Sequence, residues 1–331
     1  MRAWILDGSG VAALRQVERP DPVPAPGHVV VRVRATSLNH RDLGIARRGV
    51  DAPLVPLSDG AGEVVATGEG VTRWTPGDRV MANFFTTWSD GPWRPHYGES
   101  ALGGAVDGML AELVALPESA LVAVPEGWSF EEAATLPCAG VTAWHALFED
   151  RPVRPGDLVV VQGTGGVSVF ALQLARLAGA QVAATSSSDR KLEVMAELGA
   201  TFRVNYRTTP DWAAEVRAVA GRDADHVVEV TGQLDASLSL AGPNGTVTVI
   251  GTTLGTDGPT VAISPSRLLR NSLHLRGVYV GSTAMLRRLA SAMASADVRP
   301  VIDSVHPFDD AVAAYETMAA ATHLGKIVVT V

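Results

Sequence analysis

The sequence predicts an α/β protein with two domains, a β-rich domain and a domain built on a doubly wound parallel sheet. Three observations support this prediction. The chain has 331 residues, which is enough for two domains of ordinary size. Its first third is rich in Val, Gly and Pro. From about residue 129, short apolar runs alternate with segments of helical spacing, as in parallel sheets covered by helices.

The first third contains short strand candidates joined by turns. Residues 28–38 (HVVVRVRATSL) alternate between apolar and polar side chains, as in a half-buried strand. Shorter strands are expected at 63–68 and 78–83, with a turn at 75–78 (TPGD) between them. Residues 84–108 have little periodicity, so we expect a loop there, either over a cavity or interface or packed on the surface.

The rest of the chain alternates between strands and helices. Residues 129–149 have helical spacing and begin with a possible capping box formed by Ser129 and Glu132. The strands and helices expected after it lie at 157–163, 169–179, 181–186, 190–199, 202–206, 212–221, 226–232, 234–242, 245–251, 264–272, 273–281, 284–296 and 309–321. A final strand at 325–331 is expected to return to the N-terminal region.

Composition excludes several classes of protein. The formal net charge is −8 and no block of Lys and Arg occurs, so we expect no nucleic-acid surface. No run of 18 apolar residues occurs, and the N-terminal residues are too polar for a signal peptide. The single cysteine, Cys138, excludes an internal disulfide. We therefore expect a cytoplasmic protein that acts on a small molecule, without a membrane or nucleic acid as partner.

Residues 159–168 (VVVQGTGGVS) place a glycine cluster between a predicted strand and a predicted helix, which is the setting of a dinucleotide-binding loop. One glycine permits the turn, a second leaves room for a pyrophosphate, and the helix directs its first N–H groups at that anion. Ser168 stands where the third glycine of this pattern is usual. The residues expected to bind the cofactor here are Gly163, Thr164, Gly165, Gly166 and Val167. The alternative is a glycine turn in an unrelated α/β protein.

The end of the next predicted strand indicates which nucleotide binds. A site specific for NAD usually has an acidic residue there, against the ribose hydroxyls. This chain has Ser186, Ser187 and Ser188, followed by Arg190 and Lys191. Hydroxyls with a cation suit a 2′-phosphate, so we predict NADPH in preference to NADH. Alternatively, the two cations belong to a solvated first helical turn. The neighbouring Asp189 is expected to cap that helix.

The glycine loop, residues 136–147 (LPCAGVTAWHAL) and residues 57–68 (LSDGAGEVVATG) together resemble the medium-chain dehydrogenase/reductase superfamily. The resemblance covers almost the whole chain, and it is greatest to the zinc-independent, quinone oxidoreductase-like branch. It implies a GroES-like catalytic domain formed by residues 1–137 and 282–331. It also implies a Rossmann NADP(H)-binding domain at residues 138–281.

The ligand types argue against a catalytic zinc ion. Zinc-containing members have Cys-His-x-Asp where this chain has Asn39 to Asp42, and Gly-His-Glu where it has Ser58-Asp59-Gly60. Cys138 matches the third ligand, but an amide and one carboxylate are poor partners for Zn²⁺. Residues 82–112 hold none of the four cysteines of the structural zinc lobe. We therefore predict no metal, with Cys138 as a small buried side chain.

Without zinc, hydrogen bonds must polarise the substrate. Asn39, His40 and Asp42 are the catalytic candidates: the amide as a donor to a carbonyl, and the other two as proton relays. Asn39 is alternatively a loop-capping residue, and Asp42 is alternatively the partner of a cation near the pyrophosphate.

Further cofactor contacts are expected outside the glycine loop, at Ser186, Ser187 and Lys191 from the chemistry given above and at the others by resemblance. They are Thr142, Ser186, Ser187, Lys191, Tyr206, Gly251, Val280, Ser282 and Lys326. Thr142, Gly251, Val280 and Ser282 are expected at the nicotinamide, Tyr206 at the 2′-phosphate and Lys326 at the pyrophosphate. The alternatives are a backbone-bonded threonine for Thr142, a core-edge aromatic for Tyr206 and a surface lysine for Lys326.

The predicted reaction is hydride transfer from NADPH to a small apolar quinone, enone or related activated carbonyl or alkene. Phe84, Phe85, Trp88 and Trp93 are expected to shape the substrate pocket. The alternatives are an NAD(P)-dependent alcohol dehydrogenase or ketone reductase, and a non-enzymatic NADPH sensor. By resemblance we expect a homodimer that pairs through residues 273–280 at the edge of the Rossmann sheet.

Overall fold

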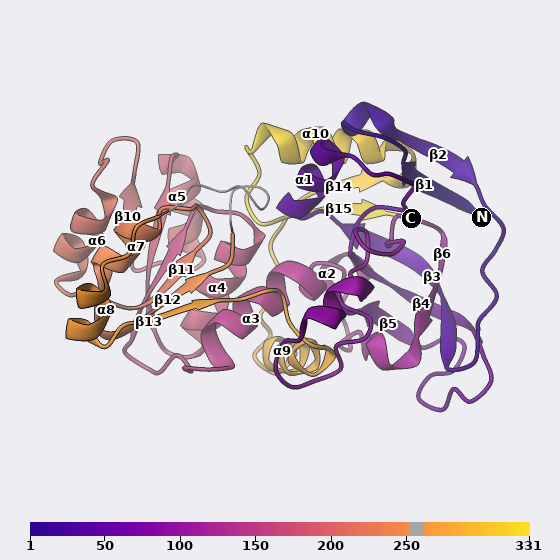
Figure 1. Cartoon of the computed structure of the whole chain (residues 1–331), viewed down its shortest axis with the longest axis horizontal. Coiled ribbons are helices and arrows are strands. Elements are labelled where there is room, and N and C mark those ends of the chain that lie inside the picture. The colour runs from indigo at the N-terminus through magenta and orange to yellow at the C-terminus, as the bar shows by residue number, and fades with distance from the viewer. Residues whose placement is uncertain (252–260) are drawn as a thin grey trace. The chain divides into compact units, whose positions relative to one another are not determined.

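The structure is a computed structural model, and it describes residues 1–251 and 261–331. These residues form two compact units (Figure 1). The first unit consists of Met1–Val141 and Val280–Val331, and the second of Thr142–Tyr279. These limits lie a few residues from the domain boundaries expected at 137 and 282. Each unit is described by itself below.

The sheet of the first unit is organised around β3 (His28–Ser37). On one side β3 pairs with antiparallel β4 (Asp59–Thr67), in a register that sets Ser37 opposite Asp59. On the other side it pairs with antiparallel β15 (Lys326–Thr330), which confirms the predicted return of the final strand. The remaining strands are β14 (Ile302–Pro307), β5 (Arg79–Ala82), β6 (Leu113–Pro117) and β7 (Leu121–Ala123), and β1 (Arg2–Leu6) and β2 (Leu14–Glu18) form a separate hairpin.

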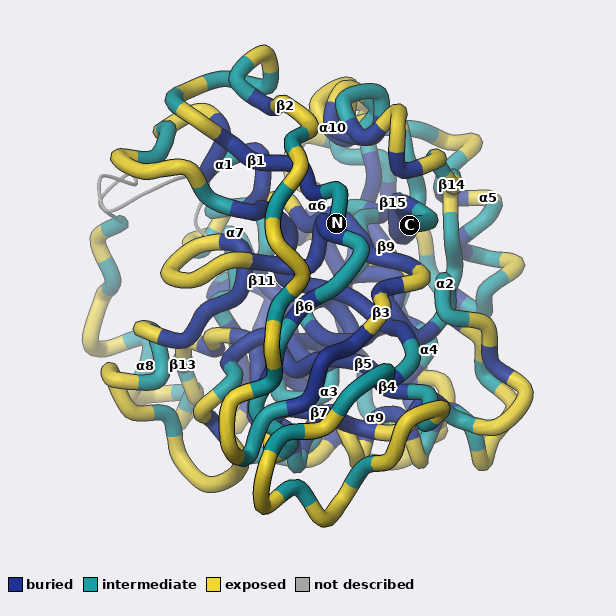
Figure 2. The backbone as a smooth tube through the Cα atoms, turned by 90° about the vertical axis from the view of Figure 1, so that its right-hand side faces the viewer, coloured by how far each residue is buried: buried dark blue, intermediate teal, exposed yellow. Residues whose placement is uncertain are grey.

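Two helices complete the core of this unit. Helix α1 (His40–Arg48) begins almost directly after β3, and α10 (Ala311–Ala320) precedes β15. Their buried side chains, including Leu43 and Tyr315, pack with Val33 and Ile327 of the sheet in one apolar cluster. Much of β3 and β15 is dark blue in Figure 2, whereas exposed residues occur in β2, in β14 and in the connections. Helix α9 (Thr283–Ser295) completes the unit.

The helix expected over 129–149 is three shorter segments. The capping box is confirmed: Glu132 N–H donates to Ser129 Oγ over 3.1 Å, and Ser129 N–H donates to a Glu132 carboxylate oxygen over 2.8 Å. However, α2 (Phe130–Ala133) gives way to a π-helical turn at Leu136–Gly140 before α3 (Val141–Phe148) begins. Pro137 has no N–H to donate, which explains the break in the helical hydrogen bonding.

The second unit contains a six-stranded parallel sheet in the order β10-β9-β8-β11-β12-β13. Its strands are β8 (Leu158–Gln162), β9 (Gln181–Ser186), β10 (Phe202–Asn205), β11 (Ala224–Glu229), β12 (Ala241–Val249) and β13 (His274–Gly277). Its helices include α4 (Gly166–Leu177), α5 (Asp189–Glu197), α6 (Trp212–Ala220), α7 (Leu234–Leu240) and α8 (Pro265–Asn271). The chain runs outward from β8 in both directions, which confirms the predicted doubly wound sheet. Ligands of such sheets bind at the carboxyl ends of the strands where the order reverses, here β8 and β11.

Burial differs between the centre and the edge of this sheet. Every residue of β8 is buried, whereas the residues of β13 are intermediate or exposed (Figure 2). The last strand is also shorter than the nine residues predicted at 273–281. Side chains of α6 and α7, among them Trp212 and Leu238, cover one face of the sheet around Val160 and Val227. In the part of the chain described, every helix is too short or too polar to cross a lipid bilayer.

Candidate functional site

The glycine loop of the second unit leaves open space before α4. Gly163 has φ +71°, a left-handed conformation that favours glycine. A Cβ atom built on Gly163 or Gly165 meets no atom of the described chain within 4 Å. Gly165 is the N-cap of α4, and it has no side chain to cap the helix. The first N–H groups of a twelve-residue helix are therefore available to an anion, so this loop fits the pyrophosphate of a dinucleotide.

Ser168 explains why the loop works without its third glycine. The side chain is buried, and its hydroxyl donates a 2.6 Å hydrogen bond to the Gln162 carbonyl at the end of β8. A small residue is therefore sufficient for α4 to lie close to the strand, and the hydroxyl adds a bond that glycine lacks.

The end of β9 carries the residues expected to choose the nucleotide. Ser186 is buried, its Oγ accepts from Ser188 N–H, and its carbonyl accepts from Tyr206 N–H over 3.1 Å. The structure thus brings Ser186 and Tyr206 together at adjacent strand ends. The expectation that Asp189 caps the next helix is wrong: Ser188 is the N-cap of α5, while Asp189 accepts a 2.7 Å hydrogen bond from Asn205 Nδ2. Lys191 lies partly buried in the first turn of α5.

A buried carboxylate at the end of β11 was missed by sequence reasoning. Glu229 is fully buried, and one of its oxygens accepts from the N–H groups of Thr231 and Gly232, each over 2.7 Å, and of Gln233 over 3.2 Å. Its other oxygen accepts from Gln162 Nε2 over 3.0 Å. The network joins the ends of β8 and β11, so it fixes the turn where the strand order reverses. A Glu at the end of an apolar strand was the available signal.

The other predicted cofactor residues occupy varied positions. Thr164, Thr142 and Val280 are buried, and Gly165, Gly166, Val167 and Ser187 are partly buried. A Cβ atom on Gly251 would lie 2.6 Å from the carbonyl oxygen of Val230, so glycine is needed there for close backbone approach. Ser282 caps α9, because its Oγ accepts from Met285 N–H. Their contacts with a cofactor remain predictions.

The first unit contains a buried polar cluster at the ends of β3 and β4 and the start of β15. Lys326 Nζ lies 2.6 Å from the Leu38 carbonyl oxygen, 2.6 Å from Asn39 Oδ1 and 3.4 Å from a carboxylate oxygen of Asp59. Lys326 is 2% exposed and Asp59 is 0% exposed, so the alternative of a surface lysine is wrong. Ser37 and Ser58 each donate a hydroxyl hydrogen bond to Asp59.

Asn39 connects this cluster to α1. Its backbone N–H donates a 2.7 Å hydrogen bond to a carboxylate oxygen of Asp42. The residue is 8% exposed, and its Nδ2 has no hydrogen-bond partner among the residues that the structure describes. One carboxylate oxygen of Asp42 is likewise buried and has no hydrogen-bond partner among the described residues. Two catalytic candidates therefore each keep one buried polar atom available to a ligand.

The titration of the catalytic candidates follows from their burial. Burial raises the pKa of Asp42 to about 6, against a smaller lowering by Arg41. The pKa of His40 is lowered, mainly by desolvation and also by Arg47. His40 nevertheless has an exposed side, so it is the candidate that solvent reaches. Near neutral pH, Asp42 exchanges a proton readily and the imidazole of His40 is neutral.

The aromatic residues expected around a substrate pocket pack mainly on one another. Phe84, Phe85 and Trp88 are fully buried. The ring centroid of Trp93 lies 4.9 Å from that of Phe85 and 5.2 Å from that of Trp88. Arg41 fixes this loop to α1: its guanidinium lies over the Phe84 ring and donates to the Leu102 carbonyl. The packing gives the loop a rigid interior, while its role in a substrate pocket remains a prediction.

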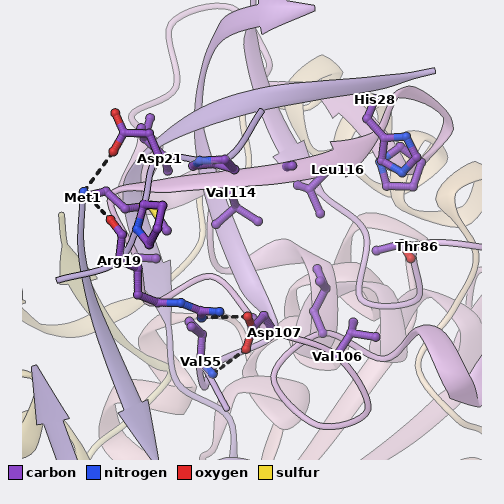
Figure 3. Close-up of a pocket in the computed structure, with 18 residues that line it drawn as sticks. Met1, Arg19, Asp21, His28, Val55, Thr86, Val106, Asp107, Val114 and Leu116 are labelled. Carbon is purple, nitrogen blue, oxygen red and sulfur yellow. Dashed lines mark hydrogen bonds and ion pairs between the residues drawn. The ribbon is translucent and has the colours of Figure 1, made fainter. Parts of the chain in front are cut away.

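A groove of about 600 Å³ lies elsewhere on the first unit (Figure 3). Its charged groups bond to one another: the N-terminal ammonium to Asp21 over 2.9 Å, and Arg19 to Asp107 over 2.7 Å. None of the candidate site residues lines it. We therefore assign no chemistry to this groove.

Two family models match successive parts of the chain. A family model described as "Alcohol dehydrogenase GroES-like domain" matches residues 25–126, and one described as "Zinc-binding dehydrogenase" matches residues 166–295. A zinc-type alcohol dehydrogenase-like protein of Schizosaccharomyces pombe is 43% identical over 317 residues, which cover 92% of this chain and 91% of the relative. The chain belongs to the medium-chain dehydrogenase/reductase superfamily. This confirms the resemblance and the pairing of a GroES-like domain with a Rossmann domain.

Other superfamily members extend the comparison. A chloroplast envelope quinone oxidoreductase homolog of Arabidopsis thaliana is 31% identical, and the match covers 97% of this chain and 95% of the relative. A solved structure described as an NAD-dependent alcohol dehydrogenase is 33% identical, with a TM-score of 0.89 and full coverage of both chains. A mycobacterial protein solved with NADPH is 26% identical, with a TM-score of 0.82 and full coverage of both chains. The protein is therefore an oxidoreductase, from a superfamily whose members bind nicotinamide cofactors.

The name of the second family model raises the question of zinc, and the residues of this superfamily member do not fit the ion. The ammonium of Lys326 already lies among the oxygens of Leu38, Asn39 and Asp59. Cys138 is only partly buried by its exposed area, in contrast to the buried side chain expected, and burial followed by the charge of Asp59 raises the pKa of its thiol. Within residues 1–251 and 261–331, no three His, Cys, Asp or Glu side chains gather as a metal site.

Proposed function

We propose that the protein is an NADPH-dependent, zinc-independent oxidoreductase that transfers hydride to a small apolar quinone, enone or related activated carbonyl or alkene. The observation that carries this proposal is the cluster of Asn39, Asp59 and Lys326. It combines a fixed ammonium with a buried amide donor that has no partner in the described chain. A conjugated acceptor spreads the negative charge that it gains, so one well-placed hydrogen-bond donor suffices without a metal ion.

The residues of the chain have separate tasks in this reaction. The open glycine loop and the N-terminus of α4 hold the pyrophosphate. When bound, the reduced nicotinamide supplies the hydride. Asn39 Nδ2 donates a hydrogen bond to the substrate oxygen, on which negative charge develops as the carbon accepts the hydride. Asp42 holds the proton that completes the product, and the exposed His40 restores that proton from solvent.

The preference for NADPH rests on the end of β9. The acidic residue nearest in sequence to Ser186 and Ser187 is Asp189, and its carboxylate is bonded to Asn205. Neutral hydroxyls therefore line this strand end, with Lys191 in the helical turn that follows. A 2′-phosphate meets donors there, whereas the ribose hydroxyls of NADH lack the usual carboxylate acceptor.

Turnover with a panel of acceptors tests the proposal. We expect NADPH oxidation with quinones and enones at a kcat/KM at least about tenfold above that with simple aliphatic ketones, because the charge in those ketones remains on one oxygen. Faster ketone reduction, or alcohol oxidation, would establish the alternative that the alcohol dehydrogenase names of several relatives favour. NADPH binding without turnover of any acceptor would establish a sensor.

A further inference from the structure

The buried ammonium of Lys326 determines which end of the Asn39 amide faces a ligand. An ammonium group has three hydrogens to donate and no lone pair with which to accept. The Asn39 atom that lies 2.6 Å from Lys326 Nζ must therefore be the oxygen. The reversed amide would set an NH₂ group against the ammonium, with two donors facing each other. The orientation of an asparagine amide is usually open to doubt, and here its neighbour decides it.

The cluster around Lys326 holds the ammonium in place. The Leu38 carbonyl and the Asp59 carboxylate accept from Lys326 on its other sides. Asp59 is oriented in turn by hydroxyl hydrogen bonds from Ser58, over 2.8 Å, and from Ser37, over 3.2 Å. The ammonium therefore has three acceptors within the first unit. This leaves its expected contact with a pyrophosphate without support from the geometry.

The same geometry makes Asn39 Nδ2 a prepared donor. The backbone of Asn39 is fixed by its hydrogen bond to Asp42, and the side-chain oxygen is fixed by Lys326. Nδ2 lies at the opposite end of the amide, buried and without a partner in the part of the chain described. A positive charge bonded to Oδ1 also withdraws electron density from the amide, which strengthens its N–H groups as donors.

We propose that Lys326 is a positioning residue of the hydride-transfer reaction: it acts through Asn39 and presents Nδ2 to the substrate oxygen. The ligand that completes this arrangement is an acceptor, namely a carbonyl or enolate oxygen. The inference rests on the proposed function for its substrate. The orientation of the amide is a property of the protein alone, so it is tested separately.

Kinetics of four variants test the coupling. We expect Lys326→Met to lower kcat by about 10- to 100-fold and to leave the Kd for NADPH within about twofold. Because Lys326 acts through Asn39, the double variant with Asn39→Ala is expected to be no slower than Asn39→Ala alone. Asn39→Asp keeps an oxygen for Lys326 and removes the donor, so it is expected to lose as much turnover as Asn39→Ala. Asn271→Ala, at the end of α8, is the control.

Three kinetic results would overturn the inference. One is a large rise in the Kd for NADPH with kcat almost unchanged in Lys326→Met, which indicates a pyrophosphate contact. Another is independent, multiplicative losses in the double variant. The third is full activity of Asn39→Asp, since a merely structural contact between Asn39 and Lys326 survives that change.

A spectroscopic measurement keeps the inference testable without turnover, and also if Lys326→Met does not fold. The chain has five asparagines and two lysines, so selective ¹⁵N-asparagine labelling gives few side-chain signals, and Asn39→Ala assigns the relevant one. We expect the Asn39 amide of the wild type to show one slowly exchanging pair of protons, without nuclear Overhauser contacts to the Lys326 ε-methylene. In a folded Lys326→Met variant, we expect the pair to broaden or shift.

Close contacts between those protons and Lys326 in the wild type would show the reversed amide and refute the proposal. A wild type without turnover on any acceptor would refute the proposed function and leave this measurement decisive for the amide.

Discussion

Buried polar side chains of the first unit differ in how completely their hydrogen bonds are satisfied. Lys326 and Asp59 bond to neighbours within the chain. Asn39 and Asp42 each retain one polar atom without a partner in the described residues. An unsatisfied buried group destabilises a protein by about 1–3 kcal/mol, so such atoms persist mainly where a ligand completes them. In the proposed reaction, the satisfied residues support the site and the two with an unsatisfied atom act in it.

The raised pKa of Asp42 makes stability depend on pH. Its pKa moves from 3.8 to about 6 on folding, so the folded chain binds the proton more tightly between these values. Stability is therefore expected to fall as pH rises through this window, by up to about 3 kcal/mol. Asp42→Asn removes this dependence. Urea denaturation is therefore expected to show that the free energy of unfolding of the variant rises relative to that of the wild type from pH 4 to 7. Parallel curves would contradict the assignment. Asp51→Asn, which removes an exposed carboxylate, is the control.

Ser186 offers a direct test of nucleotide choice. Replacing it by Asp places a carboxylate at the end of β9, where it repels a 2′-phosphate and accepts hydrogen bonds from ribose hydroxyls. Fluorescence titration is expected to show the ratio of the Kd values for NADPH and NADH rising by about tenfold or more. The same ratio in the variant and the wild type would remove the argument for NADPH. Ser291→Asp, on an exposed part of α9, controls for added charge.

At the scale of elements, the cofactor site depends on how β8, α4 and the turn after β11 meet. Ser168 ties α4 to β8, and Glu229 ties the turn at residues 231–233 to the end of β8 through Gln162. The glycine loop lies between two fixed strand ends, and its two open glycines have no packing role within the described chain. Gly163 also has the left-handed φ of the turn, whereas Gly165 has an ordinary φ, so we propose that the space at Gly165 serves binding.

Gly165→Val tests this proposal. The residue has φ −75°, which any amino acid adopts, and its Cβ position is open. We expect thermal denaturation to be nearly unchanged, while the Kd for NADPH rises by about tenfold or more because the side chain fills the pyrophosphate position. Gly277→Val is a matched control, since its Cβ position is equally open but lies in β13. Equal effects of the two variants on the Kd would show that the loop does not hold the cofactor.

The sequence predicted the second unit better than the first, for physical reasons. Buried parallel strands such as β8 are continuous apolar runs, and glycine loops have a local pattern. The hairpin β1–β2, helix α1 and strand β14 were not predicted; β2 and β14 are short and partly exposed, so they lack a continuous apolar pattern. Lys326 was identified as a site residue, but its burial beside Asp59 depends on pairing between strands far apart in sequence, which no local pattern encodes. Glu229 stood at the end of a predicted apolar strand, but its contact with Gln162 of the neighbouring strand was not apparent from the local pattern.

At the scale of the whole molecule, we propose a homodimer. Strand β13 is the edge of the six-stranded sheet, and its residues are intermediate or exposed. An unpaired edge of this kind pairs readily with its copy. Sedimentation velocity at micromolar concentration is expected to show a dimer, and a monomer under these conditions would refute the proposal.

We propose that in this oxidoreductase a hydrogen-bond donor held by a buried ammonium takes the place of a metal ion. The most direct test is the rate of NADPH-dependent enone or quinone reduction after exhaustive dialysis against a chelator, with zinc measured in the same sample. We predict an unchanged kcat with far less than one zinc ion per chain, because Asn39 and Lys326 supply the polarisation. Loss of activity on dialysis, with recovery on stoichiometric Zn²⁺, would contradict the account.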